Sequence, residues 1–272
     1  MSTKTPDDVR TTVPRTPSQA ATQPSHTLGP TLIDRLAQLA LILGALLTTS
    51  GFILAFTTAP LASGGNVSVP ALIGNQMVTA KLLLSQKIFY FHVPVAIVSF
   101  GSLFFTAFYG LRFLLKHNPA HDLQAKTSAE VSLVFILMTM ASGTLWERFD
   151  WGVWWTWEPR LTTYLILMLL VIAYFILRKA IDDPERRAVF ASVFGIIAFV
   201  DAPVSFLITR LVPNGTHPVV FRSDVGLPPG MLLPFLLALL GMLMVAFALY
   251  RLRLRERRLR ELLDAMKATL DD

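Results

Sequence analysis

Residues 146–160 read WERFDWGVWWTWEPR, and all five tryptophans of the 272-residue chain fall within residues 146–157. Inside this stretch, Gly152 allows the backbone to turn or to approach a neighbour closely. Pro159 suits the first turn of a helix, and Glu158 suits the position beside the positive end of that helix. The stretch therefore predicts a tryptophan-rich loop that ends where a helix begins.

The sequence on either side of this loop is much more apolar than that of a soluble domain. The chain is 53% hydrophobic and 15% charged, with a mean hydropathy of +0.56. A helix needs about 20 apolar residues to cross the hydrocarbon core of a bilayer. We therefore expect an all-α integral membrane protein with six transmembrane helices, and the tryptophan-rich loop lies between the third and the fourth. The predicted spans are 32–57, 88–115, 129–146, 161–178, 188–210 and 230–250.

The two ends of the chain differ from this apolar middle. Residues 1–27 are rich in Thr, Pro, Ser and Gln and predict a disordered tail. Residues 28–251 form the predicted six-helix membrane domain. Residues 252–272 are strongly basic and then amphipathic, and they predict a helix that lies on the membrane, docks on a partner or simply ends the last span in solvent. One face of this helix would carry Leu259, Leu262, Leu263, Met266 and Leu270.

The distribution of positive charge predicts the orientation in the membrane. Eighteen of the 24 Lys and Arg residues lie in the N-terminal tail and the start of the first span, in the connections after the second and fourth spans, and at the C-terminus. Basic residues gather on the cytoplasmic side of membrane proteins. Both termini are therefore predicted in the cytoplasm and the tryptophan-rich loop on the outer face. Because this orientation accounts for the net charge of +6, we expect membrane lipid and no nucleic acid as a partner.

Composition also excludes several chemistries. The chain has no Cys, which excludes disulfides, thiol catalysis and iron or zinc sites with Cys ligands. It has no phosphate-binding loop with Gly and Lys, so any ATP would be used by a partner.

The tryptophans have two interpretations. Tryptophan favours the membrane interface, where it forms aromatic belts, but a belt is spread over both interfaces. The other connections and span ends have no Trp. The concentration in one outer loop instead favours a planar apolar surface for a large, flat aromatic ligand.

The histidines narrow the choice of ligand. Of the five, only His92 and His217 are predicted outside or at the outer end of a span; His26, His117 and His121 are predicted on the cytoplasmic side. Imidazole is a haem-iron ligand, and two imidazoles can occupy both axial positions of one iron. Each histidine alone could equally be a surface or helix-packing residue. Their position on the same face as the tryptophans points to a bis-histidine haem site.

Three segments carry a resemblance to a known family. WGVWWTWEPRLT resembles the tryptophan-rich signature of the haem-handling family of cytochrome c biogenesis, the WWD-domain (CcmC/CcmF/CcsA) family. KIFYFHVPVA, around His92, is similar to the segment of that family with its first outer histidine. THPVVFR, around His217, lies where the second belongs. The length and the six spans are most similar to the CcmC-type haem exporters, and the resemblance covers roughly residues 30–250.

The resemblance implies a function and a set of partners. Haem b would be held non-covalently and transiently at the outer face of the bacterial cytoplasmic (inner) membrane, and delivered to a periplasmic haem chaperone (CcmE-like) for cytochrome c maturation. An ABC-type ATPase complex (CcmA/CcmB-like) and a small single-span protein (CcmD-like) would be further partners. The chain would then be a transport protein and not an enzyme.

The resemblance also implies a role for individual residues. His92 and His217 would be the axial ligands, and Arg160 could pair with a haem propionate, with Glu158 or with a lipid phosphate. The platform and the rest of the motif would be Trp151, Gly152, Trp154, Trp155, Trp157 and Glu158.

The sequence departs from the family pattern in two places. The family usually has Asp where this chain has Glu158, and the segment before His217 is less aromatic than the family's. Two other functions stay open: a synthetase-type component that attaches haem to cytochrome c, and a transporter of an unrelated small solute with the tryptophans as an aromatic cage.

Overall fold

The computed structural model describes residues 29, 31–59, 72–212, 227 and 230–271. Six helices account for nearly all of them, and the described part of the chain contains no strand. The helices are α1 Leu32–Thr57, α2 Leu72–Lys116, α3 Pro119–Asp150, α4 Pro159–Ala180, α5 Pro184–Leu211 and α6 Leu232–Asp271. Each is long and apolar enough to cross a membrane. The prediction of an all-α protein with six spans is confirmed.

Several helices extend beyond the predicted spans. α2 has 45 residues and starts well before the apolar run at 88–115. α6 has 40 residues and runs unbroken across the predicted boundary between 251 and 252. Apolar runs mark only the part of a helix that needs lipid or core contacts, so they underestimate helices that continue in polar sequence. The predicted disordered tail, residues 1–27, lies outside the described residues.

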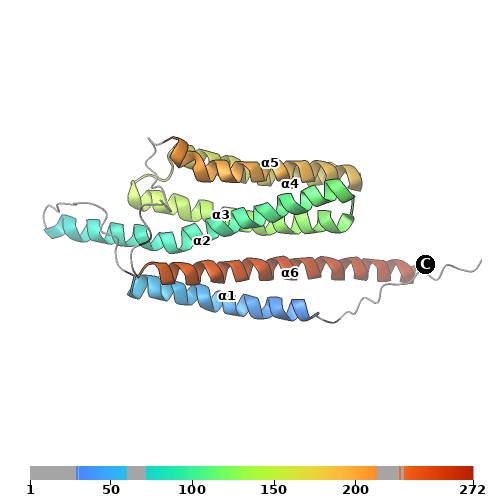
Figure 1. Ribbon diagram of the computed structural model, residues 1–272, viewed down its shortest axis with the longest axis horizontal. Coiled ribbons are helices and arrows are strands. Elements are labelled where there is room, and N and C mark those ends of the chain that lie inside the picture. Colours follow the sequence, from blue (N-terminus) through green and yellow to red (C-terminus); the bar gives the residue numbers. More distant parts are fainter. Residues whose placement is uncertain (1–28, 30, 60–71, 213–226, 228–229, 272) are drawn as a thin grey trace, which may run out of the picture. The chain divides into compact units, whose positions relative to one another are not determined.

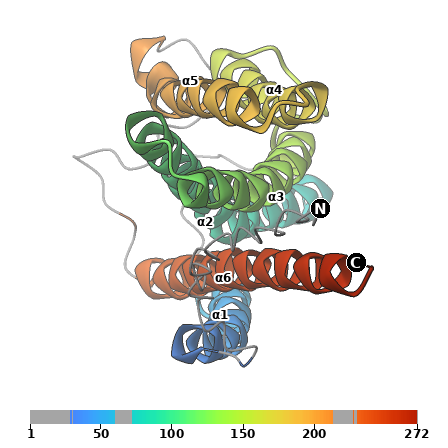
Figure 2. The ribbon, with the colours of Figure 1, turned by 90° about the vertical axis from the view of Figure 1, so that its right-hand side faces the viewer.

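Within the unit Thr31–Asp272 the helices pack in layers. α4 and α5 lie against α2 and α3, and α6 followed by α1 covers the opposite side of α2 and α3 (Figures 1 and 2). The α1–α6 contact depends on glycine, because a Cβ on Gly51 would lie 2.8 Å from the backbone nitrogen of Ala238. Small residues let membrane helices approach closely in this way.

Ionic contacts join the helices at the end away from the tryptophan-rich loop. The Arg178 guanidinium of α4 donates to both carboxylate oxygens of Asp122 in α3, at 2.6 and 2.7 Å. Asp34 of α1 pairs with Arg251 and Arg255 of α6. In the same region Glu130 of α3 pairs with Arg253 and Arg257 of α6. These pairs connect α3 to α4, α1 to α6 and α3 to α6 at the end predicted to be cytoplasmic.

Candidate functional site

The tryptophan-rich loop connects α3 and α4 directly. α3 ends at Asp150, and the backbone N–H of Trp151 donates to the Glu147 carbonyl at 2.8 Å. Gly152 has a φ of 78°, a left-handed conformation that glycine adopts without strain. α4 starts at Pro159 with Glu158 as its N-cap residue. The predicted turn at Gly152 and the helix start at Pro159 are both confirmed.

The four loop tryptophans do not face the same way. Trp154 and Trp157 have 61% and 75% of their surface exposed. The Arg148 guanidinium lies over the Trp154 ring, 5.7 Å from its centroid, and donates to the Gly152 carbonyl. Trp155 is half-buried and meets Trp157 edge to face at 5.7 Å. The loop therefore presents two rings outward and turns one inward.

His92 is fixed in α2 by contacts with α3. Its Nδ1 lies 2.9 Å from the Ser142 hydroxyl, and its ring meets Trp146 edge to face at 5.5 Å. A Cβ on Gly143 would lie 3.1 Å from the imidazole Cε1, so glycine makes room for the ring. The Ser142 hydroxyl donates its one hydrogen to the backbone, with the Met138 carbonyl at 2.8 Å. It therefore accepts from Nδ1–H of His92, and Nε2 is the basic nitrogen.

A small cavity brings three predicted site residues together. His92, Trp155 and Arg160 line it, together with Tyr164 and Ser205, between α2, α3, α4 and α5. Its volume is about 40 Å³, whereas sites for small organic ligands have about 300 to 1,000 Å³. At this volume the cavity can hold a few water molecules but not a large flat ligand.

Polar groups that the sequence analysis did not single out lie behind the loop. Glu147 is 1% exposed, and no side chain of the described residues donates a hydrogen bond to its carboxylate. The Trp155 Nε1 and the Thr156 hydroxyl are also buried without a hydrogen-bond partner in the described part of the chain. Buried polar groups are normally paired, and the Glu147 carboxylate lies within reach of the Thr156 backbone, which links the loop to the end of α3. Nothing in the local sequence distinguishes Glu147 from an ordinary helix-end glutamate.

The remaining predicted site residues divide into two groups. Trp151 and Glu158 are half-buried, Gly152 is exposed, and all three lie in the loop. His217 lies outside the described residues, so its distance from His92 stays untested.

Comparison with known proteins gives a consistent result. The family described as heme exporter protein C (CcmC) matches residues 75–269. Heme exporter protein C of Rhodobacter capsulatus is 32% identical over 195 residues, which cover 68% of this chain and 79% of the relative. Heme exporter protein C of Escherichia coli K12 is 30% identical over 174 residues, 63% of this chain and 69% of the relative. A putative cytochrome c biosynthesis ccmC-like mitochondrial protein of Marchantia polymorpha is 35% identical over 120 residues, 44% of this chain and 50% of the relative.

The matched region is more than half of the chain and includes α3, the tryptophan-rich loop, α4, His92 and His217. It also includes five of the six helices in whole or in large part. The chain belongs to the heme exporter protein C family.

Proposed function

We propose that this protein binds haem at the outer face of the bacterial cytoplasmic membrane and delivers it to a periplasmic haem chaperone for maturation of c-type cytochromes. Membership of the heme exporter protein C family supports a role in haem handling for cytochrome c biogenesis. The family name describes export, which supports a transport role for the chain and not catalysis.

The arrangement of His92 is the observation that carries the proposal. A haem-ligating histidine is usually oriented by a hydrogen bond from its other ring nitrogen. Ser142 gives His92 this orientation, at the same end of the bundle as the tryptophan-rich loop. We assign His92 as one axial ligand through Nε2. His217 is proposed as the second on the resemblance of its segment.

The loop supplies the surface for the porphyrin. Trp154 and Trp157 offer exposed aromatic faces, and Arg160 offers a guanidinium that suits a propionate. Because the cavity around His92 measures about 40 Å³, haem reaches Nε2 only when the loop moves outward.

The partners follow from the same proposal. A CcmE-like chaperone would take the haem at the outer face, and a CcmA/CcmB-like ATPase complex with a CcmD-like single-span protein would supply energy and assembly. The bound species would be non-covalent haem b.

The first test is the visible absorption spectrum of the protein, purified in detergent after expression with ample haem. We expect a Soret band that shifts or weakens in His92→Ala and in His217→Ala. Added imidazole should restore the band of His92→Ala, because it replaces the lost ligand. His121→Ala is the matched control, since His121 stacks on Tyr109 at the opposite end of the bundle.

Two results would contradict the proposal. One is a wild-type protein without a Soret band under these conditions. The other is a band that His92→Ala and His121→Ala leave equally unchanged, which would place any bound haem elsewhere.

A further inference from the structure

A large apolar cavity lies at the loop end of the bundle, between α1, α2 and α3. Its volume is about 480 Å³, and Phe52, Phe56, Phe91, Phe149 and Met138 form much of its wall. Phe56 is 62% exposed, as are several other apolar residues around the rim, so the cavity opens on the lipid-facing side of the helices. This volume falls within the range of small-molecule sites.

One cation lines this apolar cavity. Lys87 is 4% exposed, and its ammonium donates to the carbonyls of Ala55 and Ala59 at the C-terminal end of α1. These carbonyls lie at the negative end of the helix, where intrahelical donors are missing. An ammonium has three N–H donors, and among the described residues the contacts with α1 use two of them.

Within the described residues, the neighbours of Lys87 do not neutralise its charge. No carboxylate in the described part of the chain forms an ion pair with it. A buried charge without a counter-ion is costly, and two carbonyls compensate only in part. An anionic group in the cavity would remove this cost, so the cavity favours an apolar ligand that carries a carboxylate.

The cavity reaches the hydrogen-bond partner of His92. Ser142 lines the larger cavity, and its hydroxyl is the hydrogen-bond partner of His92. A ligand between α1 and α3 would therefore lie beside the hydrogen-bond partner of the proposed haem ligand.

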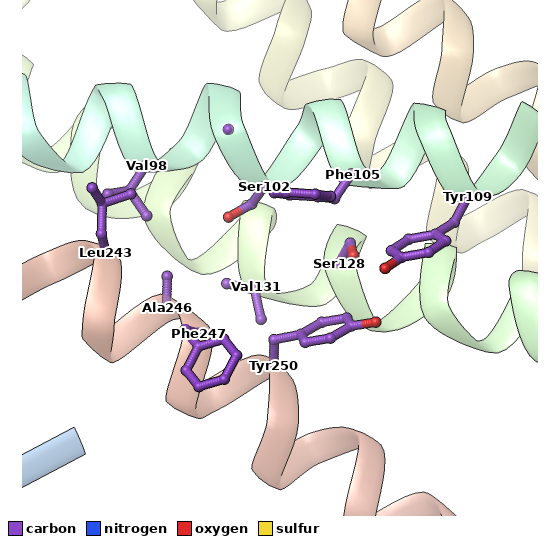
Figure 3. Close-up of a pocket in the computed structure, with 11 residues that line it drawn as sticks. Val98, Ser102, Phe105, Tyr109, Ser128, Val131, Leu243, Ala246, Phe247 and Tyr250 are labelled. Carbon is purple, nitrogen blue, oxygen red and sulfur yellow. The ribbon is translucent and has the colours of Figure 1, made fainter. Parts of the chain in front are cut away.

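A third cavity lacks the charge that makes the cavity beside Lys87 suitable for a ligand with a carboxylate. It measures about 330 Å³ and lies between α2, α3 and α6, with Phe105, Tyr109, Ser128 and Tyr250 among its lining residues (Figure 3). Its described lining residues include hydroxyls and aromatic rings but no charged side chain. It offers nothing specific to a carboxylate, unlike the cavity beside Lys87.

We propose that the cavity between α1, α2 and α3 is a lateral binding site for the carboxylated porphyrin, where haem leaves the bilayer, and that Lys87 pairs with one propionate. The inference rests on the proposed function, because it takes haem as the cargo. It gives haem two binding positions in this protein. In one the porphyrin ring and a propionate make the contacts, and in the other the iron is ligated.

Iron-free protoporphyrin IX tests this site separately from iron ligation. Its fluorescence is titrated with wild-type protein, His92→Ala, Lys87→Met, Lys87→Arg and Ala141→Trp, which fills the cavity. We expect wild type and His92→Ala to bind equally. Lys87→Met should bind at least about tenfold more weakly, as expected for a lost charge-assisted hydrogen bond. Lys87→Arg should retain most of the affinity, and Ala141→Trp should lose most of it.

The ligand supplies a control that needs no variant. Protoporphyrin IX dimethyl ester lacks the carboxylates, so it should bind wild type as weakly as the acid binds Lys87→Met. Lys87→Met should bind the acid and the ester with equal affinity. Lys116→Met, at the exposed far end of α2, should behave as wild type.

The outcomes separate this inference from the proposed function. If the acid and the ester bind wild type equally, or if Lys87→Met binds the acid like wild type, the lateral site is refuted and Lys87 only caps α1. A lost Soret band in His92→Ala would still support the proposed function in that case. Retained porphyrin binding with an unchanged Soret band in His92→Ala would instead overturn iron ligation and leave the lateral site standing.

Discussion

At the scale of single residues, the orientation of His92 depends on a neighbour that the sequence does not reveal. Ser142 lies 50 positions further along the chain, in another helix, and accepts a hydrogen bond from the imidazole. Such a partner fixes both the tautomer and the direction of the ring. The orientation of His92 as a proposed haem ligand is therefore a property of the α2–α3 contact.

Removal of this partner should weaken haem binding without abolishing it. We expect Ser142→Ala to lower haem affinity about 10- to 100-fold, the usual effect of losing the residue that orients a ligating histidine. A spectrophotometric haem titration measures it. Thr144→Ala removes a hydroxyl two residues away that, among the described residues, bonds the Ala141 carbonyl and not His92, so it should have no effect. Equal haem affinities of Ser142→Ala and wild type would show that Ser142 does not contribute to haem binding.

Substitutions of the loop tryptophans should differ in effect according to whether the ring points outward or inward. Trp154→Ala and Trp157→Ala remove exposed rings, so we expect thermal stability close to wild type and weaker haem binding. Trp155→Ala empties an inward position and should lower the free energy of unfolding by at least about 2 kcal/mol. Thermal unfolding in detergent and haem titration measure the two effects. Loss of stability in Trp157→Ala, equal to that in Trp155→Ala, would show that the loop acts as one packed unit.

Sequence reasoning predicts residues whose role depends on local conformation. Gly152 and Pro159 are of this kind, because a positive φ and a helix start are local requirements. Lys87 and Glu147 could not be identified in this way, because their roles depend on groups that folding brings close to them. The acceptor carbonyl of Ala55 is 32 positions from Lys87.

At the scale of helices, the α1–α6 pair depends on close backbone approach. We expect Gly51→Ala to lower the free energy of unfolding by about 1–3 kcal/mol, the usual cost of overpacking. The added methyl group would lie 2.9 Å from the Pro234 carbonyl oxygen and closer still to Ala238. Gly101→Ala is the control, because a Cβ there meets nothing within 4 Å. Unfolding of both variants in detergent with a denaturant measures the difference, and equal stabilities would mean that α1 and α6 can move apart at no cost.

The positions of the spans were predictable, but the packing between them was not. A helix that is apolar on all sides does not show in its sequence which face meets lipid and which meets protein. α1 illustrates this: its buried positions include Ala37, Gly44 and Gly51, while most of its large apolar residues are exposed. The small residues are the only indication of its contact face, and they become evident only beside α6.

At the scale of the whole molecule, the orientation in the membrane is the prediction with the widest consequences. Because the chain has no Cys, single cysteines can report it without background. We expect Val153→Cys, exposed in the tryptophan-rich loop, to react with a membrane-impermeant maleimide in intact spheroplasts. Met266→Cys, exposed near the end of α6, should react only after permeabilisation. The reverse labelling pattern would show that the topology is inverted. The proposed haem site would then lie on the cytoplasmic face.

The length of α6 has a mechanical consequence. Forty residues at 1.5 Å each make a rod of about 60 Å, roughly twice the thickness of the hydrocarbon core. Near one end of this rod Phe235 stacks on Phe89, two residues from Lys87, and the other end carries the exposed Leu263 and Met266. A stiff rod pivoting by about 5° shifts its far tip by about 5 Å. A partner that pushes on the tip would therefore act as on a lever arm, and the movement would reach the helix turn of α2 that carries Lys87.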